Sequence, residues 1–325
     1  RSSDLALLAG LVPVFINDYV IVFISRLLLG VGVGLFNNLA YSLIMAVYEG
    51  EERQTMLGFQ SAVGTVGNAL ASFVVGLLIS NGWQVAFNVN WLFVIPLVLF
   101  GLFATKIDQF TNPVVTETGD TVPIKAKETT NMAVVGYVLL IATFFAFYFG
   151  LLLKLAGFLV EQHLGTAAVA ATQLSVMSLI GLLPSLLYGQ IYKHLRRLTI
   201  PIGLIITGLG IGIIATAGTL TMTWIGIVIS GFGLPIVMPA IFGKVAEVQP
   251  EGSSNLSSAL MLVGINVAVF LSPQVLAVTT QIIGQTSNKA TMLVSTVMLF
   301  VLGAIQLVMA TTKKQPIKNR SEMKS

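Results

Sequence analysis

The segment 54–105 reads QTMLGFQSAVGTVGNALASFVVGLLISNGWQVAFNVNWLFVIPLVLFGLFAT, and it contains no Asp, Glu, Lys or Arg. Because about 20 apolar residues span the hydrocarbon core of a bilayer as a helix, this segment is long enough for two crossings. In the whole chain of 325 residues, 55% are hydrophobic and 9% are charged, whereas soluble domains carry about 25% charged residues. The segment and the composition together predict a protein embedded in a membrane.

Apolar blocks continue on both sides of this segment, bounded by charges, prolines or polar turns. They cover residues 4–17, 20–47, 55–80, 84–105, 132–159, 170–190, 199–218, 222–243, 256–283 and 290–312. The alternation in segments of about ten residues that is typical of membrane barrels is absent from the sequence. We therefore expect an all-α membrane protein with ten transmembrane helices.

One long polar interruption divides these spans into four and six. It runs from Lys106 to Asn131 and contains charged residues and two prolines, as expected of a solvated linker. We expect residues 1–105 to form part of a first helical bundle and residues 106–131 to form the linker. Residues 132–312 are expected to form a second bundle of six helices, and residues 313–325 a tail.

The 17 Lys and Arg residues are distributed unevenly when the chain is threaded through ten spans. Arg26 and Lys154 fall inside spans, Lys289 falls on one side, and all the others fall on the opposite side. Since Lys and Arg of short loops are retained in the cytoplasm, we expect a multi-pass plasma-membrane protein with a cytoplasmic linker and tail. The net charge of +4 then follows from topology and gives no reason to expect nucleic-acid binding.

Several stretches resemble the major facilitator superfamily. Residues 25–34 read SRLLLGVGVG, residues 48–53 read YEGEER and residues 82–88 read GWQVAFN. They are similar to the family's fourth to sixth helices, where an Arg-x-x-x-Gly-x-Gly helix, an acidic-then-Arg turn and a Gly-Trp entry follow at this spacing. The resemblance implies a two-bundle fold of twelve helices, of which ten are in this chain and about two lie upstream of Arg1.

A further stretch, GQIYKHLRR at residues 189–197, resembles the basic motif that the family repeats between its eighth and ninth helices. The resemblance implies a cytoplasmic gate, in which the cations pair with acids on neighbouring helix ends such as Glu247 or Glu251. The gate residues are Gly189, Lys193, Arg196 and Arg197. The alternative is that the cluster only sets topology and contacts lipid headgroups.

Two departures separate the chain from the family's drug exporters. Leu29 stands where many of them have Gln, and residues 64–69, GTVGNA, lack the proline of their fifth-helix motif. Both weaken an assignment to proton-driven drug export.

Arg26 is the first candidate pathway residue, because an ionisable residue inside a span marks a functional or paired site. At about 100° per residue, Asn37 and Tyr41 lie on nearly the same face of the helix as Arg26, so a polar stripe is expected to face the cavity between the bundles. The alternative is that Gly30 and Gly34 form a packing seam and Asn37 bonds to a neighbouring helix.

Lys154 is the second intramembrane cation, and it shares a helix face with Phe147 and Glu161. Both Lys154 and Arg26 lie near the outer ends of their spans, where a long side chain can also reach the headgroups. A water-linked relay from Lys154 to Glu161 and a role for Glu161 in the outer loop are both open. Tyr148, Asn68 and Asn266 complete the candidate pathway residues, with packing between helices as their alternative.

These features favour a secondary active transporter that moves a small solute by alternating access, for which proton-coupled efflux of a drug or metabolite is expected. The alternative is an uptake permease for a small organic anion or sugar-like solute. We expect a monomer in membrane lipid that binds a small-molecule substrate, with protons as the coupling ion and no cofactor or metal. No carboxylate lies deep in a span, so the coupling acid is expected upstream or at Asp18 or Glu161. Uniport, or coupling through Arg26 and the substrate, is the open alternative.

Other classes of protein are disfavoured. An intramembrane enzyme needs paired acids or a histidine cluster in its spans, whereas His163 and His194 fall in loops. A channel would need a ring of like residues or a re-entrant filter. No cysteine and no nucleotide-binding Gly-x-x-x-x-Gly-Lys motif occur, so thiolate chemistry is excluded and direct drive by ATP is not expected.

Overall fold

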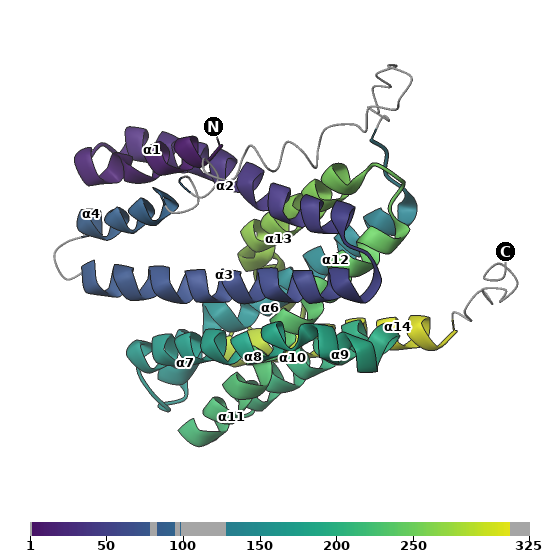
Figure 1. Ribbon diagram of the computed structural model, residues 1–325. Helices are drawn as coiled ribbons and strands as arrows, with labels where there is room; N and C mark the ends of the chain where they lie inside the picture. The colour runs from purple at the N-terminus through teal and green to yellow at the C-terminus, as the bar shows by residue number, and fades with distance from the viewer. Residues whose placement is uncertain (1, 79–82, 95–97, 99–127, 313–325) are drawn as a thin grey trace, which may run out of the picture.

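The computed structural model describes residues 2–78, 83–94, 98 and 128–312, without the side chains of 2–6, 35–37, 72–73, 75–77 and 83. In this part of the chain every regular element is a helix and no β-strand occurs (Figure 1). The predicted all-α fold is therefore confirmed. Most of the predicted linker, the predicted tail and the Asn37 side chain lie outside the described residues.

The helices follow one another with short connections. They are α1 (Ser2–Phe15), α2 (Tyr19–Val47), α3 (Gly50–Leu78), α4 (Trp83–Ala86), η2 (Phe87–Phe93), α6 (Met132–Glu161), α7 (Ala167–Ile180), α8 (Leu182–Leu186), α9 (Tyr188–Leu195), η3 (Arg196–Leu198), α10 (Thr199–Ala215), α11 (Leu220–Gly231), α12 (Gly233–Val248), α13 (Ser254–Ile282) and α14 (Asn288–Thr312).

Among the described residues, seven helical stretches are long and apolar enough to cross a membrane. They are 19–47, 132–161, 167–186, 188–215, 220–248, 254–282 and 288–312. The stretch 188–215 is interrupted at Arg196. The backbone there has φ +46°, and α9 ends at the residue before it. The helices α7, α8 and α9 instead follow one another alongside α3, and α10 turns back after η3 (Figure 1).

Polar caps and turns set the helix ends. Asp18 Oδ1 accepts the backbone N–H of Ile21 at the start of α2, and Asn131 Oδ1 accepts that of Val134 at the start of α6.

Because the long helices alternate in direction, their connections gather at two ends of the molecule. We call the end that holds Arg53, Lys193, Arg196, Arg197 and Lys244 the basic end, and the end that holds Asp18, Glu161 and Lys289 the far end.

The helices form two groups that pack against each other. The first group is α1 to η2, and the second is α6 to α14. Within the second group, Gly210 of α10 and Gly226 of α11 bring the two backbones close, because a Cβ on Gly210 would lie 2.7 Å from the Gly226 carbonyl oxygen. Between the groups, α2 contacts α13, and α3 contacts α7, α8, α9 and α12.

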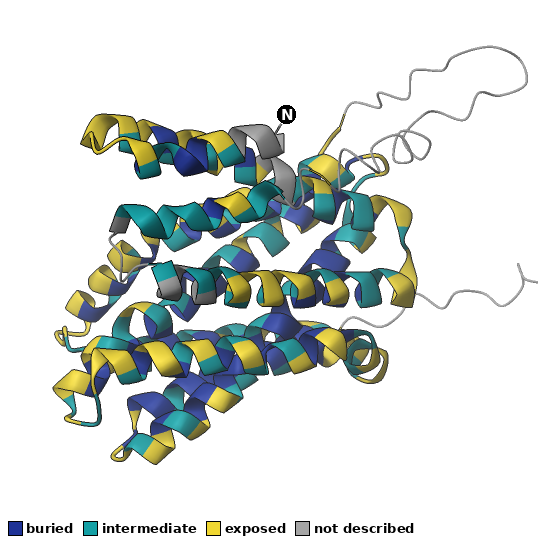
Figure 2. Cartoon of the chain, turned by 60° about the vertical axis from the view of Figure 1, so that its left-hand side comes forward, coloured by how far each residue is buried: buried dark blue, intermediate teal, exposed yellow. Residues whose placement is uncertain are grey.

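Burial is concentrated in the second group, whereas much of α2 is exposed along its outer face (Figure 2). Phe144, Phe158 and Phe242 are among the largest fully buried side chains of the second group. Large apolar residues such as Tyr19, Phe270 and Ile282 are more than 70% exposed. An apolar surface of this kind is expected of helices that lie in lipid.

Candidate functional site: a cavity between the two helix groups

The two groups enclose a central cavity of about 360 Å³. Its walls come from α2, α3, α6, α7, α11, α12 and α13. The lining residues are Tyr41, Gln60, Ser61, Gly64, Thr65, Asn68, Phe145, Tyr148, Met177, Ser178, Gly181, Gly231, Leu234, Pro235, Met238 and Leu262. All of these described residues are uncharged, so the cavity offers hydroxyls, amides and aromatic rings rather than fixed charges.

The helix α3 supplies most of the polar side of the cavity. Residues 61, 64, 65 and 68 recur at the i, i+3, i+4 and i+7 spacing that places them on one helix face. Next to them, the buried Oε1 atom of Gln60 has no hydrogen-bond partner. A buried acceptor without a partner costs about 1–3 kcal/mol, so a hydrogen-bond donor placed in the cavity would be bound favourably there.

Aromatic side chains supply the rest of the wall. The Tyr41 ring on α2 stacks on Phe242 of α12, with ring centroids 4.1 Å apart. On α6, Tyr148 stacks on Phe144 at 5.5 Å, and Phe145 meets Phe144 edge to face at 5.5 Å. These contacts hold the rings in place, so that they present fixed surfaces to the cavity.

A second hollow continues from the cavity toward the far end. It measures about 600 Å³ and shares Asn68 and Ser178 with the central cavity. Its other lining residues include Ala69, Leu152 and Leu174, which lie closer to the far end on α3, α6 and α7. The two cavities therefore adjoin at Asn68 and Ser178, between α3, α6 and α7.

Toward the basic end α3 closes against α8 and α9. The Tyr188 hydroxyl of α9 donates to Gln54 Oε1 of α3 at 3.1 Å, and Ser61 and Ser185 share a hydrogen bond of 3.2 Å. Gly58 permits this approach, because a Cβ there would lie 2.7 Å from the Ser185 carbonyl oxygen. In the described part of the chain, these contacts close the basic end between α3 and the helices α8 and α9.

The helices α2 and α13 close the basic end on the other side of the cavity. The Ser258 hydroxyl donates to Asn38 Oδ1 at 2.7 Å, and the Asn38 amide donates to Asn255 Oδ1 at 2.5 Å. Asn38, which the sequence analysis does not single out, thus links the first group to the second. The polar contacts span more than 200 residues of sequence, so helical periodicity alone could not identify them.

The predicted gate residues lie at the basic end, where Arg196 faces a different acid from the two expected. Arg196 Nη2 lies 4.0 Å from Glu51 Oε1 on α3, and both side chains are more than half exposed. Glu247 instead pairs with Lys244 at 2.7 Å and accepts the Tyr192 hydroxyl at 3.2 Å. Gly189 faces the Thr55 hydroxyl of α3. Lys193 and Arg197 lie beside Arg196 and are exposed.

Arg26 is bound within the first helix group. Its Nη2 atom donates to the carbonyl oxygens of Ala9 and Gly10 on α1, both at 3.0 Å. The guanidinium carbon also lies 4.8 Å from the ring centroid of Phe87 in η2. These contacts fix α1, α2 and η2 to one another, and Arg26 is not among the described residues that line the central cavity.

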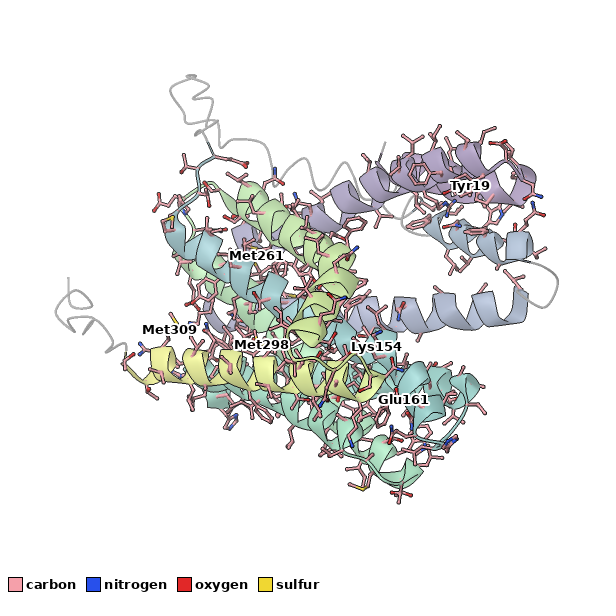
Figure 3. All side chains as sticks on the ribbon, turned by 180° about the vertical axis from the view of Figure 1, so that it is seen from behind. Tyr19, Lys154, Glu161, Met261, Met298 and Met309 are labelled. Atoms are coloured by element: carbon pink, nitrogen blue, oxygen red, sulfur yellow. The ribbon has the colours of Figure 1, made fainter. Side chains whose placement is uncertain are left out.

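Lys154 and Glu161 lie near the far end on α6 but do not pair (Figure 3). Glu161 Oε2 accepts the backbone N–H of Asn288 at 3.2 Å and its side-chain amide at 2.9 Å. The carboxylate therefore fixes the start of α14. Lys154 lines a separate cavity between α6, α13 and α14.

The structure brings together Tyr41, Asn68 and Tyr148 of the predicted pathway residues. Phe147 is buried within the helix packing, and Asn266 is exposed with its amide donating to the Leu262 carbonyl of its own helix. Neither of these two lines the described cavity. Their roles in transport stay predictions. Four further lining residues were not among the predicted pathway residues: Ser61, Thr65, Ser178 and Phe145. The spacing of Ser61 and Thr65 on α3 could have identified these two from the sequence.

Two helix groups that meet around a central cavity and close at one end are an arrangement typical of membrane transporters. The sequence pattern of the Major Facilitator Superfamily matches residues 3–273, so the chain belongs to this family. The predicted family is therefore confirmed. No curated protein sequence matches the chain.

Solved structures of transporters share the fold. The human organic anion transporter MFSD10 (TETRAN) matches with 13% identity and a TM-score of 0.71, over 94% of this chain and 76% of that one. The proton:xylose symporter XylE matches with 15% identity and a TM-score of 0.67, over 95% and 78%. A bacterial homologue of the iron transporter ferroportin in its outward-facing state matches with 12% identity and a TM-score of 0.69, over 96% and 83%.

Proposed function

We propose that this protein carries a small, uncharged solute across the membrane by secondary active transport through the central cavity. The observation that carries the proposal is the unpaired, buried Oε1 atom of Gln60 in a cavity whose described walls bear no charge. A solute hydroxyl or N–H would satisfy this acceptor. A charged solute would lose its hydration without gaining a counter-charge from these walls.

The aromatic walls define the rest of the proposed solute. Tyr41 and Tyr148 offer ring faces, and Asn68 offers an amide. A cavity of about 360 Å³ lies at the small end of the range for ligand sites, about 300–1,000 Å³. A compact solute with one apolar face and a few hydroxyl or amide groups fits this lining. We propose direct solute contact for Tyr41, Asn68 and Tyr148, and a positioning role for Arg26.

We further propose that the basic end is cytoplasmic, in a monomer of the plasma membrane. The linker 106–131 and the tail 313–325 then lie in the cytoplasm, between and after bundles formed by 1–105 and 132–312. The excess of Lys and Arg at the basic end supports this orientation. Closure of that end by residues 189–197 then holds the pathway open to the outside.

For direction, we propose proton-coupled efflux, which rests on the resemblance of residues 25–34 to the fourth helix of exporters. The second candidate is an uptake permease. Uptake of a sugar-like solute is favoured over that of an organic anion by the uncharged hydroxyls and amides of the described cavity lining. The two directions differ in the response of flux to an imposed proton gradient.

Ligand-dependent thermal unfolding of the purified full-length protein tests the solute class. A hexose, a neutral aromatic drug, a dicarboxylate and a cationic dye would be compared, because a bound ligand raises the unfolding temperature by mass action. We expect stabilisation by a neutral compound only, and at least about tenfold weaker binding in Gln60→Leu, a loss of about 1.4 kcal/mol. Phe59→Leu on the exposed side of α3 is the matched control.

Flux measurements complete this test. The stabilising compound would be followed into and out of proteoliposomes, with and without a proton gradient and a protonophore. Saturable flux that Gln60→Leu reduces and Phe59→Leu retains supports the proposal. Stabilisation by the dicarboxylate or the dye alone, with unchanged binding in Gln60→Leu, contradicts the uncharged-solute assignment.

A further inference from the structure

A separate cavity of about 460 Å³ lies between α6, α13 and α14 near the far end. On α6, Lys154 stands nine residues after Phe145, which lines the central cavity. At 100° per residue the two positions are about 180° apart around the helix. The Lys154 cavity is therefore distinct from the central cavity and opens on the opposite face of α6.

Lys154 has no partner for its charge in the described part of the chain. Neither ion pair found there involves Lys154, and no hydrogen bond to its ammonium group occurs. The nearest carboxylate along the helix, that of Glu161, is held by Asn288. An unpaired cation inside a membrane span is unfavourable, so a partner of opposite charge would stabilise Lys154.

The walls of this cavity supply further hydrogen-bond donors. The Gln281 amide and the Thr286 hydroxyl line it, and no hydrogen bond to either side chain occurs among the described residues. Thr280 and Thr291 also line the cavity, but their hydroxyls donate to the backbone carbonyl oxygens of Leu276 and Ser287. A cation beside free amide and hydroxyl donors is the chemistry that binds a carboxylate or a phosphate. A neutral or cationic guest would leave Lys154 unpaired.

We propose that the cavity lined by Lys154, Gln281 and Thr286 binds an anionic group, a carboxylate or a phosphate, at a site separate from the transported solute. Because the cavity lies near the far end, an anionic group can reach it from two sources. One is the phosphate of a lipid headgroup in the adjacent leaflet, and the other is a soluble anion from the aqueous phase. The site does not depend on what the central cavity carries.

Thermal unfolding of the full-length protein in a neutral maltoside detergent tests the site. The probes are dihexanoyl phosphatidylglycerol, dihexanoyl phosphatidylcholine as the zwitterionic match, inorganic phosphate and succinate. We expect the anionic probes to raise the unfolding temperature of the wild type. The apparent Kd should increase at least about tenfold in Lys154→Gln. Lys154→Arg should retain binding, and Lys289→Gln, which removes an exposed cation at the same end, should bind as the wild type does.

The probes distinguish the two sources. Stabilisation by phosphatidylglycerol alone indicates a lipid headgroup, and stabilisation by phosphate or succinate as well indicates a soluble anion. The proposal is overturned if Lys154→Gln binds the anions as well as the wild type does, or if anionic probes stabilise the wild type no more than phosphatidylcholine does. Loss of an unpaired intramembrane charge does not impair folding, so Lys154→Gln remains measurable.

Discussion

The hydroxyl of Tyr188 on α9 donates a 3.1 Å hydrogen bond to Oε1 of Gln54 on α3, and both side chains are at least 99% buried. The bond joins the two helix groups at the basic end of the molecule. It can exist only while α3 and α9 are together, so it stabilises the closed basic end and not an arrangement in which water enters there.

We therefore predict that Tyr188→Phe opens the basic end more often. The closed arrangement would bury an unpaired Gln54 acceptor, at a cost of about 1–3 kcal/mol, whereas water would satisfy that acceptor in the open one. Because the chain contains no cysteine, a single Thr55→Cys reporter, at a position that faces Gly189 of α9, can be labelled with an impermeant maleimide added at the basic end. Labelling should be about five-fold faster or more in Tyr188→Phe, following the shift in population.

Tyr192→Phe is the matched control for this prediction. Tyr192 lies one turn along α9, and its hydroxyl bonds to the exposed Glu247. Its loss leaves a carboxylate that water can solvate, so the labelling rate should change little. Equal rates in the two Phe variants would contradict the assigned role of Tyr188.

The close approach of α3 to α8 and α9 gives a second prediction. A Cβ on Gly58 would lie 2.7 Å from the Ser185 carbonyl oxygen and 2.7 Å from Tyr188 Cβ. Since these atoms belong to packed helices, Gly58→Ala should destabilise the closed basic end by about 1–3 kcal/mol. Spin labels at Glu52 and His194, two exposed positions, should report a longer and broader distance distribution in double electron–electron resonance.

Gly67→Ala controls for the change in helix propensity. Gly67 lies on the same helix, and a Cβ there would meet no atom within 4 Å. The spin-label distances should therefore match those of the wild type. A shift of the same size in both alanine variants would show that helix propensity, and not the contact with Ser185, sets the distance.

The backbone at Arg196 gives a third prediction, on stability. Its φ of +46° lies in a region that side chains rarely adopt but glycine adopts readily. Arg196→Gly should raise the free energy of unfolding by about 1 kcal/mol relative to Arg196→Ala, because only glycine relieves the strain. Both variants lose the ion pair with Glu51, which is exposed and 4.0 Å long and contributes little. Equal free energies of unfolding in urea for the two variants would show that the backbone at Arg196 is not strained.

Much of the fold could be predicted from the sequence, because membrane helices are encoded locally. The apolar block 256–283 corresponds to α13 at 254–282, and the block 290–312 to α14 at 288–312. The block 222–243 falls within α11 and α12, which together reach Val248. Length and hydropathy decide these boundaries, and both can be read without knowledge of the partner helices.

The candidate site could be predicted only in part, since a helix face does not identify its neighbour. Arg26 shares a face with Tyr41 over several turns, yet Arg26 meets α1 and η2 whereas Tyr41 meets the central cavity. Lys154 and Glu161 likewise share a face, but Asn288 of α14 occupies the carboxylate. The contacts that separate these residues come from distant parts of the chain, which periodicity does not reveal.

Arg26 gives the last prediction, which separates a positioning role from solute contact. Arg26→Ala removes hydrogen bonds to the Ala9 and Gly10 carbonyls and the contact with the Phe87 ring. Hydrogen bonds from a charged donor contribute about 1.5–3 kcal/mol, and a cation–π contact about 0.5–2 kcal/mol. The variant should therefore unfold at a clearly lower temperature, because α1 and η2 lose their contacts with the Arg26 side chain of α2.

The solute affinity of folded Arg26→Ala should equal that of the wild type if Arg26 acts by positioning helices. Arg26→Lys, which keeps the charge but has fewer donors, should fall between the two in stability. Leu27→Ala, at a neighbouring exposed position of α2, controls for loss of side-chain volume. Flux per folded molecule and solute Kd would be measured together in proteoliposomes and detergent. An unchanged unfolding temperature with a raised solute Kd would instead place Arg26 in the solute pathway, and would require the guanidinium to leave α1 during the transport cycle.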